Sequence, residues 1–525
     1  MTTTTADIAA LLDGRPDAVA LVESRRGACR TTRRGELVRR CHRIARALHE
    51  AGVRPGHKAV VMTRDAHDLT AVSYALGLLG AVPVLIEPRA EVGRCLRDVA
   101  PDVFIGEPLA HLGRRALGWG RPHVRVALVT GSAPLPAGRR LITRTQADGS
   151  RLPHVREPGG DAPALIAFTS GSTGRPKGAE YRRSTLAGQL DALTALMGPR
   201  PDDVLLAGFL PVALLGPLLG LTTVAPAVNH LAPARTSPEE LVGPVLEHRA
   251  SIVLASPAVL ALIARHCARH GVTLPSVRQV LSFGAPLRTG LADALRGAVP
   301  DDAEILSVYG ATECLPVSAI GDHDLRASRA APPAGHAGTC LGRPLPGVRA
   351  RILDADATGL GEIAVTGPTV SPAYHARPDA DAVTKSDTGH GVLHRTGDLG
   401  RIDDEGRLWF LGRKAHLVTG AGFTLTTEDI EATADTAPGV RRTALVGVGT
   451  AVCQLPVLCV EPLPSTPHAA ALAAVRAVLR DHPEGHRVGA LLVRPSFPTD
   501  PRHNSKTDRM RLAGWAAGRL RGRIR

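Results

Sequence analysis

Hydrophobic and polar positions alternate between helical and strand periods over the first two thirds of the chain. Residues 34–53 carry Leu, Val and Ile at helical spacing up to Gly52, which predicts a helix that ends there. Further strands are predicted in KAVVMTRD (58–65), VPVLIEP (82–88), ALIAFTS (164–170) and VRQVLSFGAP (277–286). Further helices are predicted in DLTAVSYALGLLGA (68–81), STLAGQLDALTALMG (184–198) and SPAVLALIARHCARHG (256–271). Such alternation predicts an α/β fold of layers with parallel sheets.

The pattern changes after about residue 340 to short strands and turns. The segment DEGR (404–407), between RID and LWF, predicts a hairpin turn. From residue 413 a smaller αβ unit follows, with two strands near 441–462 and a helix over 469–482. Since 525 residues exceed one hydrophobic core, we predict a large domain over 1–412, built of layered αβ subdomains with a small β-rich portion. A small, mobile C-terminal α+β domain is predicted over 413–525.

The charge of the chain changes this picture little. The formal net charge is +14, and nearly all of the positive charge is arginine, spread without interleaved aromatic residues. This composition favours anionic substrates, and no nucleic-acid-binding motif is present, so no nucleic-acid partner is predicted. The basic C-terminal end is typical of a frayed terminal helix, with docking to an anionic surface as the alternative.

Cysteine spacing and apolar segments bear on the compartment. The eight cysteines form no CxxC pair and no Cys/His cluster at metal-ligand spacing, which favours a reducing compartment and argues against a structural zinc. The N-terminus lacks the pattern of a signal peptide. The most apolar run, 205–227, is interrupted by Pro and Gly, so it is predicted to line the buried interior of the protein and not to span a membrane. We therefore expect a cytoplasmic protein.

The stretch FTSGSTGRPKGAE (168–180) carries the clearest candidate chemistry. It combines glycines, four Ser/Thr hydroxyls and Lys177 directly after an apolar run. Glycines let backbone N–H groups converge on a ligand, hydroxyls add donors and the lysine adds charge, which together suit a phosphate. No Ser or Thr follows the lysine, so the stretch is not the common P-loop. A solvated surface loop is the alternative.

Further motifs follow it in a fixed order: LSVYGATECLPVS (306–318), GEIAVTGPTVSPAY (361–374), HRTGDLGRIDDEGRLWFLGRK (394–414) and RHNSKTDRMRL (502–512). Together they resemble the adenylate-forming superfamily of acyl-CoA synthetases, nonribosomal-peptide adenylation domains and luciferases. The resemblance implies that a carboxylate and ATP give an acyl-AMP and pyrophosphate, with Mg²⁺ as cofactor. Catalysis of such a step rests largely on positioning and charge neutralisation.

The resemblance assigns roles to residues of this chain. It implies phosphate binding by Thr169, Ser170, Gly171, Ser172, Thr173, Gly174 and Lys177. Tyr309 and Gly310 would form the adenine shelf, and Thr312 would donate to the phosphate. Asp398 and Arg413 would hold the ribose, and Glu313 would hold Mg²⁺. Lys506 would bridge the substrate carboxylate and the α-phosphate.

The segment GRKAHLVTGAGFTLTTEDIE (412–431) departs from the superfamily pattern. His416 stands where an acidic hinge residue is expected, and Thr419 stands where a lysine is expected. This departure, with the GRKAH and RHN-x-K stretches, is similar to the OleC-type branch, the β-lactone synthetases. That branch activates a 2-alkyl-3-hydroxy acid, whose own hydroxyl then closes the lactone and releases AMP. His416 is a candidate for assisting proton loss from that hydroxyl, although a hinge histidine more often only hydrogen-bonds.

An apolar pocket would have to take the alkyl chains of a fatty acid. We predict that its walls include Phe209, Leu214, Leu215, Phe283, Gly284 and Ala285. Ordinary core packing explains any one of these residues equally well.

Three other functions stay open at this point. The first is a medium- or long-chain acyl-CoA synthetase, and the second is an acyl-AMP ligase that loads a carrier protein. The third is a catalytically dead scaffold, which would be expected to lose Glu313 or Lys506, and both are present. The fatty acid is the expected small-molecule partner, and other enzymes of its biosynthetic pathway are the candidate assembly partners.

Overall fold

The structure is a computed structural model of the 525-residue chain. It describes residues 15–25, 28–86, 91–131, 139–140, 162–168, 175–229, 232–330, 338–498 and 507–521.

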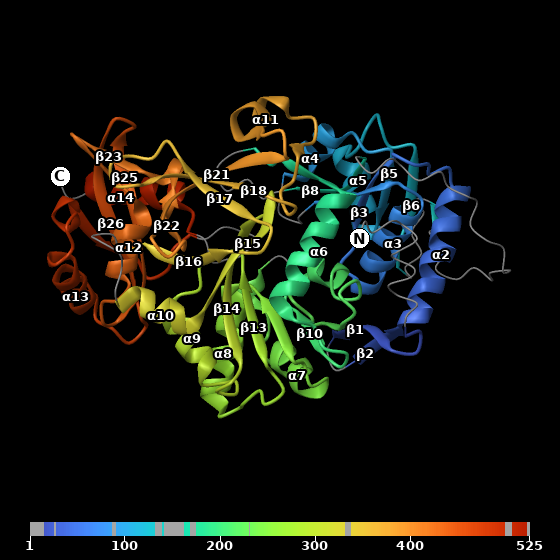
Figure 1. Ribbon diagram of the computed structural model, residues 1–525, viewed down its shortest axis with the longest axis horizontal. Helices are drawn as coiled ribbons and strands as arrows, with labels where there is room; N and C mark the ends of the chain where they lie inside the picture. Colours follow the sequence, from blue (N-terminus) through green and yellow to red (C-terminus); the bar gives the residue numbers. More distant parts are fainter. Residues whose placement is uncertain are drawn as a thin grey trace.

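An eight-stranded sheet forms one half of the large N-terminal part (Figure 1). Its order is β19-β9-β8-β4-β3-β5-β6-β7, and the run from β8 to β7 is parallel. The bounds are Lys58–Met62 (β3), Val82–Leu85 (β4), Val103–Gly106 (β5), Val126–Val129 (β6), Arg139–Arg140 (β7), Pro163–Phe168 (β8), Gly178–Arg182 (β9) and Ala373–Tyr374 (β19).

Both faces of this sheet are covered by helices, which explains its near-continuous hydrophobic strands. Successive side chains point to opposite faces. Val61 packs in the cluster that contains α2 and α3, whereas Val60 and Phe104 pack in the cluster that contains α4. These helices span Arg34–Glu50 (α2), Ala66–Leu78 (α3), Val92–Val99 (α4) and, beyond them, Pro108–Leu117 (α5).

A 14-stranded sheet forms the other half. Its order is β17-β18-β21-β22-β16-β15-β14-β13-β12-β10-β11-β1-β2, and β20 pairs with β21. From β14 to β1 the strands are parallel, whereas from β14 outward to β17 they are antiparallel. The parallel part comprises Val19–Arg25 (β1), Val204–Ala207 (β10), Thr222–Ala225 (β11), Ile252–Ala255 (β12), Gln279–Phe283 (β13) and Glu304–Ala311 (β14), with Ala28–Arg33 (β2) antiparallel at the edge. The antiparallel part comprises Cys314–Gly321 (β15), Thr339–Pro344 (β16), Arg349–Leu353 (β17), Gly361–Thr366 (β18), Lys385–Asp387 (β20), Val392–Ile402 (β21) and Leu408–Arg413 (β22).

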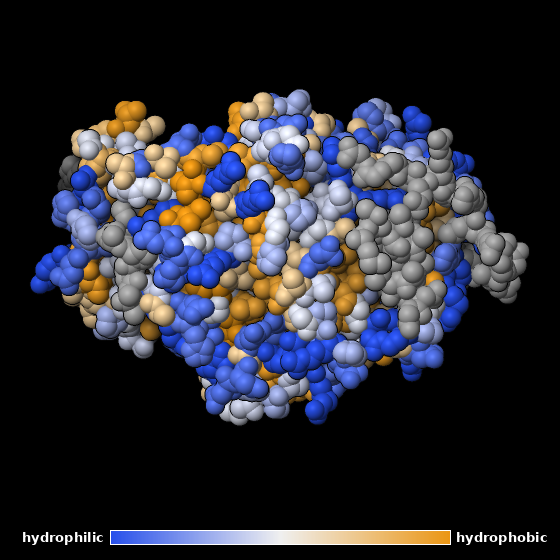
Figure 2. All heavy atoms as spheres, in the orientation of Figure 1, coloured by the Kyte–Doolittle hydropathy of each residue, from blue (hydrophilic) through white to orange (hydrophobic). Residues whose placement is uncertain are grey.

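Helices cover the second sheet as well, and one helix lies between the two sheets. Helix α6 (Arg183–Met197) contacts β8 and β9 on one side and β15 on the other (Figure 1). Helix α8 (Pro257–His270) buries its apolar face and leaves Arg265 and Arg269 outside. The other covering helices are α7 (Glu239–Glu247), α9 (Thr289–Arg296), α10 (Asp322–Ala330) and α11 (Pro378–Thr384). Figure 2 shows hydrophilic residues over α8 and α9 and hydrophobic ones gathered in the middle of this face.

The chain after residue 413 forms smaller sheets at one end of the molecule (Figure 1). Strands β25, β26 and β27 make a three-stranded sheet, and β23 and β24 make a hairpin. The bounds are Lys414–His416 (the 3₁₀ turn η3), Val418–Gly420 (β23), Phe423–Leu425 (β24), Thr427–Ala434 (α12), Val440–Thr450 (β25), Cys453–Pro462 (β26), His468–Arg480 (α13), Ala490–Val493 (β27) and Arg509–Arg521 (α14). Among the described residues, each hydrophobic cluster lies wholly before residue 412 or wholly after residue 417. This distribution supports the predicted division at 412/413, which stays a prediction.

Polar side chains join the two parts where α12 meets the 14-stranded sheet. Arg288 pairs with the buried Glu428, and its Nε lies 3.6 Å from Asp435 Oδ2. Thr339 Oγ1 donates to Glu428 Oε1 over 2.6 Å, and Arg329 Nη2 donates to the Ala432 carbonyl over 2.6 Å. We call these contacts the α12 interface.

The α/β class and the expected elements are confirmed. The helix predicted over 34–53 is α2, and the turn predicted at 404–407 joins β21 to β22, where Gly406 has a positive φ of 75°. The apolar run 205–227 folds as β10, the 3₁₀ turn η1 (Leu210–Leu214) and β11. In the part of the chain that the structure describes, no helix has both the length and the apolar character of a membrane span.

Candidate active site

The predicted phosphate loop joins two antiparallel strands. Phe168 at the end of β8 pairs with Gly178 at the start of β9. The predicted ligands Thr169, Ser170, Gly171, Ser172, Thr173 and Gly174 lie outside the described residues. Lys177, the last member of the set, places its Nζ 4.7 Å from the centre of the Tyr374 ring. A cation over an aromatic face is favourable, so the lysine is held beside β19.

Three of the predicted nucleotide-binding residues meet in one cluster. Asp398 on β21 and Arg413 on β22 are paired across the antiparallel ladder, and Arg413 Nε lies 2.9 Å from Asp398 Oδ1. The Tyr309 hydroxyl on β14 donates to Asp398 Oδ2 over 2.7 Å. Burial and the charge of Asp398 raise the pKa of Tyr309, so its hydroxyl stays protonated and continues to donate. The Asp398 carboxylate likewise raises the pKa of Arg413.

This cluster suits the ribose of ATP. Asp398 Oδ1 is buried and accepts no hydrogen bond from the described residues, although the Arg413 charge is close. A buried carboxylate oxygen without a donor is costly unless a ligand supplies one. A ribose hydroxyl is such a donor, and the site therefore fits the nucleotide that the sequence predicts.

The end of β14 carries Gly310, and the turn from β14 to β15 carries Thr312 and Glu313, next to this cluster. A Cβ at position 310 would lie 2.8 Å from the Cys314 carbonyl oxygen, so only glycine fits. The Tyr181 hydroxyl of β9 donates to the Thr312 carbonyl, and the Ser371 N–H donates to the Glu313 carbonyl over 2.8 Å. These bonds tie the turn to the edge of the eight-stranded sheet.

Glu313 lies among groups that keep it ionised. Its Oε1 accepts a hydrogen bond of 2.6 Å from the Tyr374 hydroxyl. Burial raises the pKa of Glu313, but the nearby His394, the Tyr374 hydrogen bond and the charge of Lys385 together more than offset burial, so its pKa lies below the ordinary value. Burial lowers the pKa of the neighbouring His394 to about 4, so that ring is neutral at pH 7. An ionised, half-buried carboxylate with one oxygen free of Tyr374 fits the hard cation Mg²⁺.

Three further residues, Tyr374, Lys385 and His394, lie around Glu313 but were not predicted as site residues from the sequence. Lys385 Nζ lies 5.0 Å from the Tyr374 ring centre and donates to the Ser371 carbonyl over 2.6 Å. The signals were present, since Tyr374 ends one quoted motif, His394 opens another and Lys385 is one of five lysines. Their common direction toward Glu313 depends on the pairing of β20 with β21 and β19 with β9.

The predicted pocket residues fall into two hydrophobic clusters. Phe283, at the end of β13, is buried, and Phe209 and Leu215 pack against the same cluster. Leu214 packs against the cluster of α2 and α3 instead. Gly284 and Ala285 follow β13 in the next turn, where Gly284 has a positive φ of 95°. The structure thus brings three of the six predicted residues together.

The remaining predicted catalytic residues lie after β22. His416 ends the turn η3 and is partly exposed. Lys506 lies outside the described residues, between Pro498 and Thr507.

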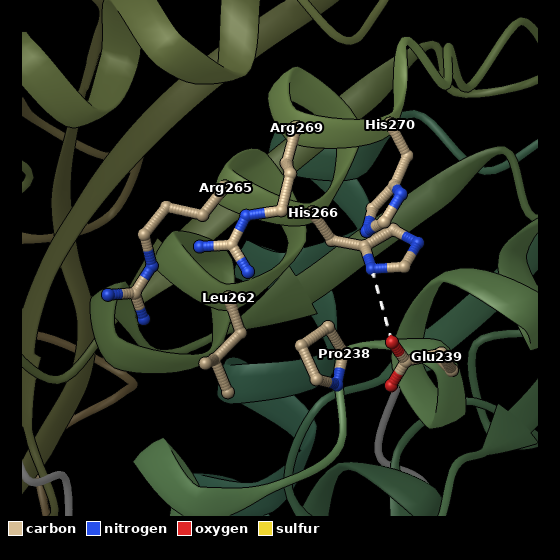
Figure 3. Close-up of a pocket in the computed structure, with 7 residues that line it drawn as sticks. All are labelled: Pro238, Glu239, Leu262, Arg265, His266, Arg269 and His270. Atoms are coloured by element: carbon tan, nitrogen blue, oxygen red, sulfur yellow. Dashed lines mark ion pairs between the residues drawn. The ribbon is translucent and has the colours of Figure 1, made fainter.

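A separate cavity of about 310 Å³ opens on the outer face of α8 (Figure 3). Its lining includes Arg265, His266, Arg269 and His270, and His266 Nδ1 lies 3.6 Å from Glu239 Oε1. No predicted site residue lines it. Its basic lining does not match a pocket for alkyl chains, so it is distinct from the candidate site.

Comparison with known proteins agrees with this geometry. The model of the AMP-binding enzyme family matches residues 9–375. The chain belongs to this family. An olefin beta-lactone synthetase of Stenotrophomonas maltophilia is 38% identical over 97% of both chains. An olefin beta-lactone synthetase of Xanthomonas campestris pv. campestris is 39% identical over 92% of this chain and 90% of its own.

Solved structures give the same fold. The amide bond synthetase McbA from Marinactinospora thermotolerans has a TM-score of 0.80 and 25% identity, covering 98% of this chain and 99% of its own. ATP-bound MatB from Rhodopseudomonas palustris has a TM-score of 0.78 and 22% identity over 98% and 99% of the two chains. This member of the AMP-binding family is an ATP-dependent adenylate-forming ligase that acts on a small molecule.

Proposed function

We propose that the chain activates a 2-alkyl-3-hydroxy fatty acid with ATP and closes it to a β-lactone. The observation that carries this proposal is the similarity to an olefin beta-lactone synthetase, which runs through 97% of both chains. That span includes both proposed domains, 1–412 and 413–525. The products would be the lactone, AMP and pyrophosphate.

In the first step the substrate carboxylate attacks the α-phosphorus of ATP, and the bond to the β-phosphate breaks. Lys177 and residues 169–174 would hold the departing phosphates. Asp398, Arg413 and Tyr309 would fix the nucleoside, and Lys506 would bring the carboxylate and the α-phosphate together. Glu313 would hold Mg²⁺, which screens the negative charge that opposes this attack.

In the second step the substrate's own β-hydroxyl oxygen attacks the acyl carbon. The bond from that carbon to the AMP oxygen breaks, AMP leaves with the electron pair, and the hydroxyl proton is released. Proximity within one molecule replaces a second substrate. We propose Phe209, Leu215 and Phe283 as part of the wall for the alkyl chains, and His416 as the group that assists proton loss.

The segment after β22 supports release without CoA. His416 and Thr419 stand where the superfamily pattern has an acidic residue and a lysine. The Thr419 N–H donates to Gln454 Oε1 over 3.0 Å, within the C-terminal part.

Product analysis tests the proposal. Full-length protein is incubated with ATP, Mg²⁺ and a 2-alkyl-3-hydroxy fatty acid, with and without CoA, and the products are identified by mass spectrometry and NMR. We expect a β-lactone and AMP in both reactions. A thioester that forms only with CoA would overturn the proposal in favour of an acyl-CoA synthetase, and an acyl-AMP that accumulates unclosed would favour a ligase that loads a carrier.

A further inference from the structure

Three side chains of types that can bind a metal ion meet at the edge of the 14-stranded sheet, where Cys29 approaches the adjacent pair Glu247 and His248. Cys29 lies in β2, Glu247 is the last residue of α7, and His248 caps that helix. Cys29 Sγ lies 3.6 Å from Glu247 Oε1 and 3.8 Å from His248 Nε2. His248 Nε2 lies 4.0 Å from Glu247 Oε2. None of these residues belongs to the candidate active site.

The backbone holds Glu247 and His248 in fixed positions. At the end of α7 the Ala250 N–H donates to the Val245 carbonyl, and the Arg249 N–H donates to the Leu246 carbonyl. This is the pattern of a Schellman motif, and Arg249 has the left-handed φ of 49° that the motif requires. A residue with a side chain rarely adopts that conformation. The motif ends the helix at His248, whose Nε2 lies near Cys29 of β2.

Cys29 is held against the same helix by strand pairing. It faces Ser24 across the β1–β2 ladder, and β1 is paired with β11 on its other side. Val22 of β1 shares a hydrophobic cluster with Val242 and Val245 of α7. The hairpin and the helix end are therefore positioned by packing that does not depend on the three side chains.

The two separations from Cys29 Sγ are close to those around a tetrahedral zinc ion. Bonds of about 2.3 Å to sulfur and about 2.0–2.2 Å to nitrogen and oxygen place the sulfur about 3.6 Å from each of the other two ligands. They place nitrogen and oxygen about 3.4 Å apart. The two separations from Cys29 Sγ agree within a few tenths of an ångström. The His248 separation of 4.0 Å is to the other carboxylate oxygen, Oε2, so the exposed Glu247 side chain would have to rotate to bring one oxygen close to both ligands.

We propose that Cys29, Glu247 and His248 form a binding site for a zinc-class divalent cation, with water at the fourth position. A thiolate and a carboxylate balance the charge of the ion, and binding releases the thiol proton. The bound ion links the β1–β2 hairpin to the end of α7. The site is structural, because it lies apart from the nucleotide-binding cluster.

Cobalt titration tests this site, because thiolate ligation of Co²⁺ gives a charge-transfer absorption in the near ultraviolet. Nucleotide-free, full-length protein is titrated with CoCl₂ and then with ZnCl₂. We expect the band to saturate at one Co²⁺ per chain and to disappear as Zn²⁺ displaces it. The band should be absent in Cys29→Ser. In His248→Asn and Glu247→Gln the affinity should fall by at least the roughly 10–100-fold that loss of an outer-shell partner costs.

Cys453→Ser is the matched control, because Cys453 is also an exposed cysteine. This variant should keep the band and its affinity. A band that survives in Cys29→Ser, or no band in the wild-type protein, would overturn the proposal. Binding by His266 and His270, which line the cavity on α8, would give no thiolate band and is thereby distinguished.

A second measurement addresses the link itself. Zinc should raise the thermal unfolding midpoint of the wild-type protein and of Cys453→Ser, but not that of Cys29→Ser. An equal rise in all three proteins would contradict the assignment. Circular dichroism confirms that the variants fold, which we expect because Cys29 and Glu247 are exposed.

Discussion

Arg413 Nε lies 2.9 Å from Asp398 Oδ1, across the antiparallel pair of strands β21 and β22. Strand pairing alone brings the two together, because they are register partners at the end of the hairpin whose turn is DEGR. The same carboxylate accepts the Tyr309 hydroxyl from β14. One buried charge thus connects three strands at the place where the nucleotide is expected.

The substitution Asp398→Asn should weaken ATP binding. It removes the charge that faces Arg413 and the strongest acceptor for a ribose hydroxyl. Hydrogen bonds to charged groups contribute about 1.5–3 kcal/mol, so the KM for ATP in pyrophosphate exchange should rise by about 10–100-fold. Asp404→Asn, at an exposed position of the same hairpin, should leave this KM unchanged. An unaltered KM in Asp398→Asn would remove Asp398 from the nucleotide site.

The substitution Glu313→Gln should raise the Mg²⁺ concentration that half-saturates pyrophosphate exchange. The amide keeps the hydrogen bond from Tyr374 but loses the charge, and Mg²⁺ prefers charged oxygen ligands. We expect a shift of about tenfold or more, since outer-shell losses alone cost about 10–100-fold. Glu405→Gln, which is exposed, is the control. If the Mg²⁺ dependence of Glu313→Gln equals that of the control, Glu313 does not hold the ion.

Stability should fall between pH 6.5 and pH 4 because of His67. This buried ring contacts the Thr32 hydroxyl over 2.8 Å and the Arg30 carbonyl over 3.0 Å. Burial, aided by the Arg30 charge and opposed by Asp65, lowers the pKa of His67 to about 4. As the pH drops through this window the unfolded chain binds a proton at this ring while the folded chain does not, so the folded state loses about 1.5 kcal/mol of stability between pH 6.5 and pH 5.

Urea unfolding at pH 6.5 and pH 5 measures this loss. His67→Gln should reduce the difference between the two pH values by about that amount. His323→Gln, at an exposed position of α10, should retain the full difference. A pH dependence that is the same in both variants would show that His67 does not carry it.

The substitution Arg288→Met should destabilise the α12 interface. It leaves Glu428 buried with Thr339 as its remaining donor across the interface. Breaking a buried pair costs about 3–5 kcal/mol, and since 37% of the Arg288 side chain is exposed we expect about 2 kcal/mol. Urea unfolding measures the change, and the double variant Arg288→Met/Glu428→Gln should recover part of it. Arg349→Met, on the exposed side of β17, is the control, and equal losses in both single variants would contradict the prediction.

Local signals in the sequence predicted most elements of the fold. The helical spacing of 34–53 gives α2, and the apolar runs at 58–65 and 82–88 give β3 and β4. The predicted elements are found because burial imposes a period on the chain. The motifs also singled out Tyr309, Asp398 and Arg413 as nucleotide ligands, and the structure brings these three together, although their role stays a prediction.

Pairings between distant segments could not be predicted in the same way. Strand β1 lies beside β11, with Leu21 opposite Thr223, and no local pattern encodes that choice. The same limit hid the approach of Cys29 to His248, because ligand spacing along the chain carries no information on residues joined by the sheet. Tyr374 stands at the end of a motif and Lys385 is one of five lysines, but their approach to Glu313 follows only from the assembled strands.

The α12 interface bears on the free energy needed to separate the N-terminal part of the chain from the part after residue 413. Arg288 and Glu428 form an ion pair at this interface. Among the described residues, no hydrophobic cluster contains residues from both parts. Separating the two parts would therefore expose the charged Arg288 and Glu428 side chains to water, but it would leave the hydrophobic core of each part buried. The strength of the interface should depend on ionic strength, because salt screens charges, and separation should add little to the heat capacity, which tracks exposed apolar area.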